Sequence, residues 1–369
     1  MAQQSFDIAV LPGDGIGPEV VAAAQDVIDQ ATSAAGVGIR WTEHEGGAQY
    51  YLDHGEGIAE KTVEAAGRAD AVLLGAMGLP WVRDRTGVEI TPQIDLRERF
   101  DLFASLRPAR LLPKVEGPLR RGRVDLLVIR ETTEGLFAGR HDHHPADHGR
   151  ASDRLTITRA GSDRLFEVAF AQAALRRERG GPGRVTLFDK ANVLRSMAFM
   201  REVFDEVAAR HPDIETERLY VDAGCMFLVT DPDRFDVVVT ENQFGDIASE
   251  VAAGVSGGLG VAPSADIGLD HAVFQPCHGT APDLAGRGLA NPVAALLSGA
   301  MMLDWLGQRH ANTAARRAAA AIEDAVAHAC RTGVRTPDLG GRASTSAVSD
   351  AVASAALRIL QGTDDTQET

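Results

Sequence analysis

Short runs of β-branched and other apolar residues alternate along the chain with longer alanine-rich stretches, in which apolar residues recur every three or four positions. This alternation is typical of an α/β fold with a largely parallel sheet. The apolar runs predict strands over residues 6–11, 71–75, 124–130, 184–188, 219–221, 236–240 and 272–275. The helical spacing predicts a helix that follows Gly17 and opens with Pro18, and further helices over 293–306, 314–329 and 347–360.

The length and the charge narrow the possible classes of protein. A chain of 369 residues is long enough for two domains. Its formal net charge of −15 argues against a nucleic-acid or anionic-membrane partner, because both need a basic surface. An anionic small substrate would therefore need a local cluster of arginines.

Cysteine usage and the chain ends indicate a cytoplasmic protein. The three cysteines are far apart in the sequence and fit neither a disulfide framework nor a CxxC site. We find no run of about 18 apolar residues and no basic leader at the N-terminus. The polar tail over 362–369 is predicted to be frayed, and the polar segment over 135–158 to form an arm. Its histidine-rich part, HDHHPADH at 141–148, is interpreted as a solvated loop, because the spacing matches no metal-ligand template.

Three arginines stand where a carboxylate substrate would need them. Arg97 and Arg107 lie in DLRERFDLFASLRP, and Arg130 ends a predicted strand. Guanidinium groups bind carboxylates bidentately, so convergence of the three would suit a di- or tricarboxylate. The alternative is three ordinary surface ion pairs.

A lysine and three carboxylates form a second candidate set. Lys190 follows a predicted strand, where α/β enzymes place ligands, and a lysine, unlike an arginine, can serve as a base. Asp222 lies in LYVDAG, while Asp246 and Glu250 are four residues apart and share one face of a helix. They are either solvated helix charges or ligands of a hard divalent cation. Repulsion between like charges at this spacing makes the cation more attractive.

Two glycine-rich segments are candidates for nucleotide binding. LPGDGIGPEV at 11–20 lacks the GxGxxG spacing, so a tight turn is favoured over a Rossmann site. CHGTAPD at 277–283 is either a turn or a loop that wraps an adenosine, in which Asp283 accepts from the ribose hydroxyls and repels a 2′-phosphate.

Taken in order, LPGDGIGPEV, LFASLRP, VIRETTEG, DKANVL, YVDAG, VVVTENQFGDI, APSADIG, HGTAPDLAGRGLANP and PDLGG resemble the metal-dependent β-decarboxylating dehydrogenases of isopropylmalate, isocitrate, homoisocitrate, tartrate and D-malate. The resemblance spans nearly the whole chain. It implies an isopropylmalate dehydrogenase-like two-domain α/β fold with a mixed, largely parallel sheet, which is not a Rossmann fold. Residues 1–103 with 258–369 would form the cofactor domain, and residues 104–257 would form the catalytic and dimerisation domain. The resemblance further implies a homodimer with shared active sites. In it, the arm near 140–160 would interlock with the second copy.

The resemblance also implies roles for individual residues. Substrate carboxylates would be held by Arg97, Arg107 and Arg130. Lys190, together with Asp222 of the partner subunit, would move the proton of the C2 hydroxyl. Mg²⁺ or Mn²⁺ would be bound by Asp222, Asp246 and Glu250. The CHGTAPD loop and the segment after it would bind the cofactor, through His278, Gly279, Thr280, Ala281, Asp283 and Asn291. The cofactor would be NAD rather than NADP, because of Asp283.

Four positions depart from the family pattern. Phe137 replaces the tyrosine that donates a proton to the enol, and Glu250 replaces an aspartate. In the substrate-selecting helix, Gln93 and Asp95 favour a smaller or more polar C3 substituent than isopropyl, such as that of D-malate or tartrate. The implied activity is NAD-dependent oxidative decarboxylation of a (2R)-malate-type substrate. The alternative is a non-catalytic regulatory subunit of a hetero-oligomeric relative, but the presence of Lys190, Asp222 and Asp246 favours the enzyme.

Overall fold

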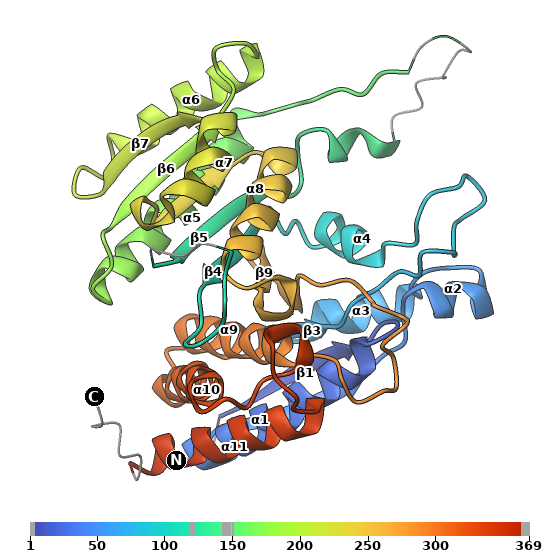
Figure 1. The fold of residues 1–369 in the computed structure, drawn as a ribbon. Helices are drawn as coiled ribbons and strands as arrows, with labels where there is room; N and C mark the ends of the chain where they lie inside the picture. Colours follow the sequence, from blue (N-terminus) through green and yellow to red (C-terminus); the bar gives the residue numbers. More distant parts are fainter. Residues whose placement is uncertain (1–3, 119–122, 142–148, 150, 363–369) are drawn as a thin grey trace.

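The computed structural model describes residues 4–118, 123–141, 149 and 151–362. Ten strands form one sheet in the order β2-β1-β3-β10-β9-β4-β5-β8-β6-β7 (Figure 1). Their bounds are Ser5–Leu11 (β1), Gly38–Glu43 (β2), Ala71–Leu74 (β3), Ala104–Arg110 (β4), Asp125–Glu131 (β5), Arg184–Asp189 (β6), Glu215–Tyr220 (β7), Val237–Thr240 (β8), Pro263–Ile267 (β9) and Ala272–Pro276 (β10).

The sheet is mixed and mostly parallel, as the resemblance implied. Strands β2, β1, β3 and β10 pair in parallel, and so do β5, β8, β6 and β7. Between these halves, β9 and β4 run antiparallel to each other and to their outer neighbours. The expected domain boundary falls at this β9–β4 junction. Because the sheet continues across it, the division into two domains stays a prediction.

Helices cover both halves of the sheet. In Figure 1, α1, α9, α10 and α11 lie beside the half that contains both chain ends, and α5 to α8 lie around the other half. The helix bounds are Gly17–Ala35 (α1), Ala48–His54 (α2), Glu60–Arg68 (α3), Pro92–Arg99 (α4), Arg159–Glu178 (α5), Arg195–Ala208 (α6), Val221–Thr230 (α7), Asn242–Val255 (α8), Val293–Arg309 (α9), Thr313–Thr332 (α10) and Thr345–Gln361 (α11), with 3₁₀ turns at Phe137–His141 (η1), Pro232–Arg234 (η2), Leu259–Val261 (η3) and Pro337–Leu339 (η4).

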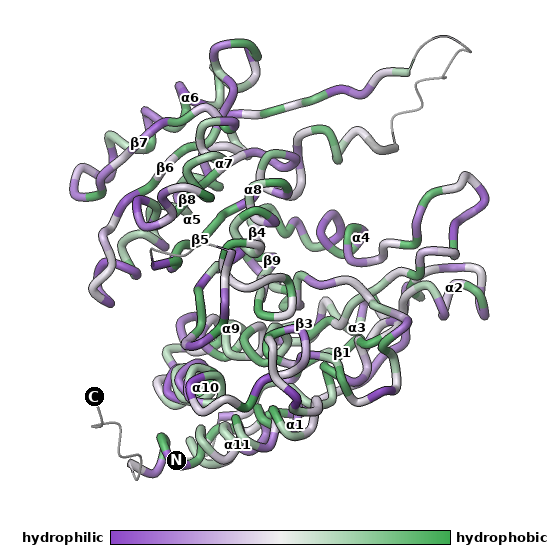
Figure 2. The backbone as a smooth tube through the Cα atoms, viewed as in Figure 1, coloured by the Kyte–Doolittle hydropathy of each residue, from purple (hydrophilic) through white to green (hydrophobic). Residues whose placement is uncertain are grey.

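Most predicted elements are confirmed, with one error and several omissions. The strand predicted over 219–221 has the wrong extent: β7 begins at Glu215 and ends at Tyr220, and Val221 begins α7. Strand β7 (ETERLY) is a polar edge strand, so its hydropathy does not identify it, and Figure 2 shows it largely hydrophilic. Strand β4 is absent from the predicted strands, and it contains Pro108, a residue that is rare inside a strand. Strand β9 pairs only with Ala104–Leu106 of β4. At Pro108, β4 is therefore paired with β5 alone.

The glycine-rich segment after β1 forms a tight turn, as its spacing favoured. Gly13 and Gly15 have positive φ, and a Cβ on Gly15 would lie 2.0 Å from the carbonyl oxygen of Thr280. Between them, buried Asp14 accepts hydrogen bonds from the backbone N–H groups of Ala48, Gln49 and Gly78 at 2.7 to 2.9 Å. This turn therefore joins β1 to α2 and to the loop that follows β10.

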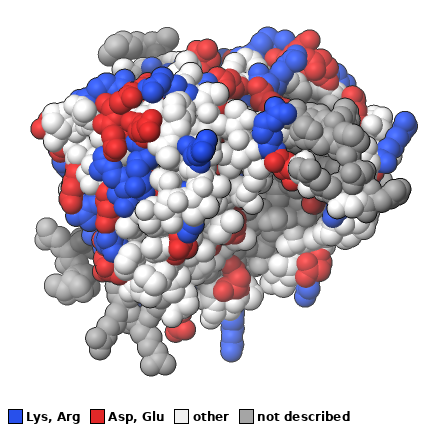
Figure 3. All heavy atoms as spheres, turned by 90° about the horizontal axis from the view of Figure 1, so that it is seen from above, with Lys and Arg blue, Asp and Glu red and all other residues white. Residues whose placement is uncertain are grey.

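Two surface properties bear on partners. No helix in the part of the chain that the structure describes is long and apolar enough to cross a membrane. On the face shown in Figure 3, basic and acidic side chains lie interspersed, without a separate basic patch among the described residues. The histidine-rich stretch at 142–148 and the tail from 363 lie outside the described residues.

Candidate active site

The three predicted arginines are buried near one another, although they come from three elements. Arg97 lies on α4, Arg107 on β4 and Arg130 on β5, and each is less than 10% exposed. Burial, together with repulsion from Arg97 and Arg107, lowers the pKa of Arg130 to about 10 despite the attraction of Asp246. Three guanidinium groups that affect one another in this way form a cation cluster. They are not the surface ion pairs of the alternative interpretation.

Each arginine has different neighbours. The Nε of Arg97 donates to Asp266 Oδ2 at 2.9 Å. Arg107 donates to Ser105 Oγ at 3.2 Å and to Cys277 Sγ at 3.6 Å. Arg130 donates to Asn242 and forms an ion pair with Asp246. The cluster is therefore held by bonds on several sides, which fixes the directions of its guanidinium groups.

Helix α8 places two carboxylates beside this cluster. Its N-cap is buried Glu241, whose side chain accepts from the N–H groups of Gln243 and Phe244. Gly245 packs against Arg130, because a Cβ there would lie 2.6 Å from Arg130 Cγ. Asp246 follows directly, and Glu250 lies one turn further. Burial raises the pKa of Glu250. The positive charge of Arg107 acts to lower this pKa, and the negative charge of Asp246 acts to raise it further. Asp246 and Glu250 therefore belong to the arginine cluster electrostatically.

Lys190 and Asp222 form a separate pair. Lys190 follows β6, Asp222 stands in the first turn of α7, and Lys190 Nζ lies 2.5 Å from Asp222 Oδ1. This bond lowers the pKa of Asp222, whose side chain is 68% exposed. Gly224 allows α7 to lie close to β6, since a Cβ there would be 2.6 Å from the Phe188 ring. The pair thus lies at the surface of the chain.

The chain alone does not assemble the predicted metal set. Within the described residues, no three histidine, cysteine, aspartate or glutamate side chains lie close enough to hold one ion. Asp246 and Glu250 lie together on α8, and Asp222 lies apart from them on α7. A set completed by a second copy stays a proposal.

The predicted cofactor residues lie in the loop after β10 and just beyond it. The backbone N–H of Ile16 donates to the carbonyl of Thr280 at 2.8 Å, so the loop rests on the glycine-rich turn. His278 Nε2 is buried without a hydrogen-bond partner in the described structure, and burial lowers the pKa of this imidazole. Asn291 donates to Asp338 at 2.9 Å, and Asp283 is exposed. Among the described residues, no atom of another part of the chain lies within 4 Å of the position that a Cβ on Gly279 would take.

Two further predicted positions lie near the arginines. Phe137 begins η1, and the guanidinium carbon of Arg130 lies 5.2 Å from its ring centroid. Gln93 precedes Arg97 by one turn of α4, and its Oε1 is buried without a partner in the described structure. Phe137 therefore lies beside the cluster, and both side chains are half-buried.

Sequence reasoning missed several residues of the cluster, among them Ser105, Asn242, Asp266 and Cys277. Asp266 and Asn242 lie inside two of the motifs that carry the resemblance, APSADIG and VVVTENQFGDI, but nothing in their spacing indicates a contact with an arginine. The strand pairing shows how these residues come together: Ser105 of β4 lies opposite Arg130 of β5 on one side and opposite Asp266 of β9 on the other.

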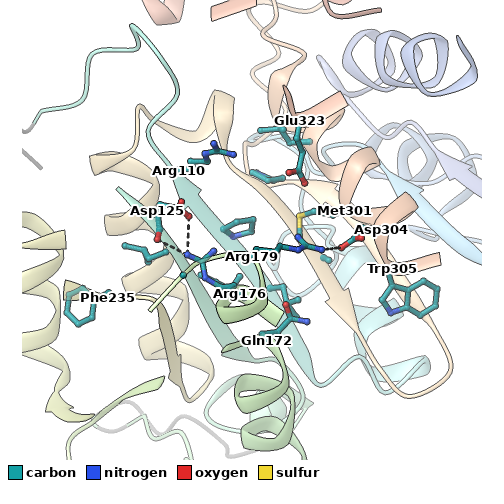
Figure 4. Close-up of a pocket in the computed structure, with 18 of the residues that line it drawn as sticks. Arg110, Asp125, Gln172, Arg176, Arg179, Phe235, Met301, Asp304, Trp305 and Glu323 are labelled. Carbon is teal, nitrogen blue, oxygen red and sulfur yellow. Dashed lines mark hydrogen bonds and ion pairs between the residues drawn. The ribbon is translucent and has the colours of Figure 1, made fainter. Parts of the chain in front are cut away.

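A cavity of about 820 Å³ lies at the other end of the β4–β5 pair (Figure 4). It is lined by Arg110 and Asp125, which face each other in the register, and by residues of α5, α9 and α10. Its arginines are largely matched by carboxylates: Arg176 pairs with Asp125 at 3.0 Å and Arg179 with Asp304 at 3.1 Å. Balanced charges of this kind do not indicate the sign of a ligand.

Comparisons with known proteins agree on one family. The family described as isocitrate/isopropylmalate dehydrogenase matches residues 7–352. A 3-isopropylmalate dehydrogenase of Hahella chejuensis is 40% identical, covering 98% of this chain and 99% of that protein. A 3-isopropylmalate/3-methylmalate dehydrogenase of Methanocaldococcus jannaschii is 39% identical, covering 94% and 97%. Among solved structures, a β-decarboxylating dehydrogenase of Thermococcus kodakarensis aligns with a TM-score of 0.79 at 35% identity, covering 99% of both chains.

Proposed function

Because this chain belongs to the isocitrate/isopropylmalate dehydrogenase family and is thus a β-decarboxylating dehydrogenase, we propose that it oxidises and decarboxylates a (2R)-malate-type substrate with NAD and Mg²⁺ or Mn²⁺. The observation that carries the proposal is the buried cluster of Arg97, Arg107 and Arg130 beside Asp246 and Glu250. Arginine forks bind the substrate carboxylates, and the acidic pair holds the cation next to them.

The substrate side chain at C3 meets the end of α4 that carries Gln93. Because the Oε1 of Gln93 is buried without a partner in the described structure, a polar or small C3 group suits this end better than isopropyl. D-malate and tartrate fit that description, and 3-isopropylmalate is the comparison substrate. Two relatives are named for isopropylmalate, and one of these also for 3-methylmalate, which has a smaller substituent.

Lys190 serves proton transfer from the C2 hydroxyl. Asp222 lies 2.5 Å from Lys190 Nζ, so it would orient the neutral amine that accepts the proton and stabilise the ammonium that forms. Within one chain the two residues lie at the surface, and Asp222 is apart from Asp246 and Glu250. We infer that the complete site forms when Lys190 and Asp222 of one copy face α8 of another.

The residues of α8 fit a hard divalent cation. Two carboxylates one turn apart supply oxygen ligands, and Asp222 of the partner subunit would be the third. When bound, the cation polarises the hydroxyl and stabilises the negative charge that decarboxylation leaves on oxygen. If Asp246 held the cation, Arg130 would still have its hydrogen bonds to Asn242.

The loop after β10 fits NAD. His278 has a buried nitrogen in need of a partner, Gly279 leaves open space, and Thr280 ties the loop to the glycine-rich turn. With Ala281 and Asn291 these residues would line the adenosine, while exposed Asp283 accepts from its ribose hydroxyls. The nicotinamide would accept the hydride from C2, and Asp283 would disfavour the 2′-phosphate of NADP.

We propose a homodimer, and the surface of α7 and α8 supports this proposal. These helices pack on each other and expose Met226, Val229 and Ile247, of which Met226 and Ile247 are about half exposed. Met226 and Val229 lie on the same face of α7 as Asp222. A second copy would cover this apolar face and bring the two half-sites together, with residues 104–257 as the dimerisation domain. We further propose that the enzyme works in the cytoplasm.

The test is formation of NADH by the purified protein with Mn²⁺ or Mg²⁺, across 3-isopropylmalate, D-malate, tartrate, isocitrate and homoisocitrate. We expect turnover with a dicarboxylate that has a small or polar C3 group, and none after removal of the cation by a chelator. Absence of turnover across the panel, with folded and dimeric protein, would reject the proposed function.

A further inference from the structure

The cavity of about 820 Å³ lies behind the arginine cluster, on the opposite face of the same strands. Successive side chains of a strand point to opposite faces of the sheet. On β4, Arg107 belongs to the cluster, whereas its neighbours Leu106 and Pro108 line the cavity. On β9, Asp266 belongs to the cluster and Ala265 lines the cavity. The cavity is therefore separated from the candidate active site by the thickness of the sheet.

The cavity has an apolar floor, and both halves of the sheet contribute to its walls. Strand β10 and helix α9 supply much of the apolar lining, through Phe274, Leu297, Met301 and Trp305. Strands β4 and β5 and helix α5 form the wall that belongs to the other half. A space of this size, with apolar walls and a few polar groups, is typical of a site for a small organic molecule.

The charged groups around the cavity balance one another. Among the described residues they are Arg110, Arg123, Arg176 and Arg179, and Asp125, Asp233, Asp304 and Glu323. Asp125 is paired with Arg123 and with Arg176. Asp304 is paired with Arg179. A ligand with a net charge would upset this balance, so the cavity favours a ligand whose own charges cancel.

Two groups of the lining have no partner of their own. Among the described residues, neither Glu323 on α10 nor Arg110 on β4 makes a hydrogen bond or an ion pair. Glu323 is half-buried, and Arg110 is exposed at the edge of the cavity. Burial raises the pKa of Glu323, while the charges of Arg179 and Arg110 act to lower it. Glu323 and Arg110 therefore face the same part of the cavity without touching (Figure 4).

We propose that this cavity is a second ligand site, which binds an α-amino acid with an apolar side chain. The ammonium of the ligand donates to Glu323, its carboxylate accepts from Arg110, and its side chain lies on the apolar floor beside Met301 and Trp305. Such a zwitterion has no net charge, so it preserves the charge balance of the lining. It also gives the half-buried carboxylate of Glu323 the cation that the chain does not supply.

The test measures dissociation constants by titration calorimetry for L-phenylalanine, L-leucine and L-methionine, without substrate, cation or NAD. We expect at least one of them to bind with a Kd below about 1 mM. Two analogues of the tightest binder separate the two polar contacts: its amide lacks the carboxylate, and its desamino acid lacks the ammonium. Each analogue should bind about tenfold more weakly. The measurement involves no turnover, so its result is independent of the proposed function.

Glu323→Gln and Arg110→Gln should each weaken binding of the amino acid by about tenfold. The matched control is Asp324→Asn, which changes an exposed carboxylate next to Glu323 on α10 and should leave the Kd unchanged. Absence of binding by all three amino acids would overturn the inference, and so would a Kd of Glu323→Gln within about twofold of the parent. Equal binding of the amino acid and its two analogues would also overturn it. That comparison uses the parent protein, so it decides the matter even if a variant fails to fold.

Discussion

The guanidinium of Arg130 lies over the ring of Phe137, with 5.2 Å between the guanidinium carbon and the ring centroid. The ring is thus next to one of the proposed substrate-binding groups, but it has no proton to donate. Protonation of the enol that remains after loss of CO₂ must rely on water or another group.

Phe137→Tyr is expected to increase product formation, because a phenol beside Arg130 can donate the proton directly. The gain should be about tenfold or more where protonation limits turnover. Parallel assays of NADH and of the decarboxylated keto acid measure it. The control is Phe199→Tyr, a ring that faces Arg159 away from this cluster. An unchanged rate in Phe137→Tyr would mean that another donor already serves.

Lys190→Ala should nearly abolish oxidation, lowering kcat by about 10² to 10⁴, because the base is lost. NAD binding, measured by calorimetry or fluorescence titration, should be unchanged, since the cofactor loop is on another part of the chain. Lys61→Ala, an exposed lysine on α3, provides the control. Substantial residual turnover would remove Lys190 from the role of base.

Asp283 should make the enzyme prefer NAD to NADP in kcat/KM by about a hundredfold, because a carboxylate repels the 2′-phosphate. Asp283→Ser should lower this preference about tenfold. Steady-state kinetics with NAD and with NADP measure this preference. The control variant is Asp350→Ser, which changes an exposed residue of α11. A parent enzyme that prefers NADP would contradict the assignment.

Asp14→Ala should destabilise the fold without any direct effect on the chemistry. It leaves the N–H groups of Ala48, Gln49 and Gly78 without their acceptor, at a cost of about 3 kcal/mol in the free energy of unfolding. Denaturant titration measures the loss. Asp53→Ala, an exposed residue of α2, should change stability by less than about 0.5 kcal/mol. Equal stability of the two variants would show that Asp14 is dispensable for the turn.

The sequence was informative where local pattern and spacing determine position. Arg130 ends a buried apolar run, and Asp246 and Glu250 are one turn apart, so their placement at a strand end and on one helix face followed directly. The favoured tight turn at Gly13 and Gly15 was likewise confirmed by their positive φ angles.

The sequence was uninformative where position depends on strand order or on a second copy. Asp266 of β9 accepts a hydrogen bond from Arg97 of α4, although 169 residues separate the two in the chain and no local pattern indicates the contact. The pairing of β9 with β4, which places Asp266 opposite Ser105, is likewise not visible in the sequence. The separation of Asp222 from Asp246 and Glu250 is a property of one subunit, which neither hydropathy nor motif spacing predicts.

The continuous sheet has a thermodynamic consequence. Strands β9 and β4 share hydrogen bonds across the junction, and Arg107 of β4 also donates to Cys277, which follows β10 in the other half. Neither half can melt without exposing an unpaired strand edge of the other. Heat or denaturant should therefore unfold both halves in a single cooperative transition, with one midpoint seen by every probe.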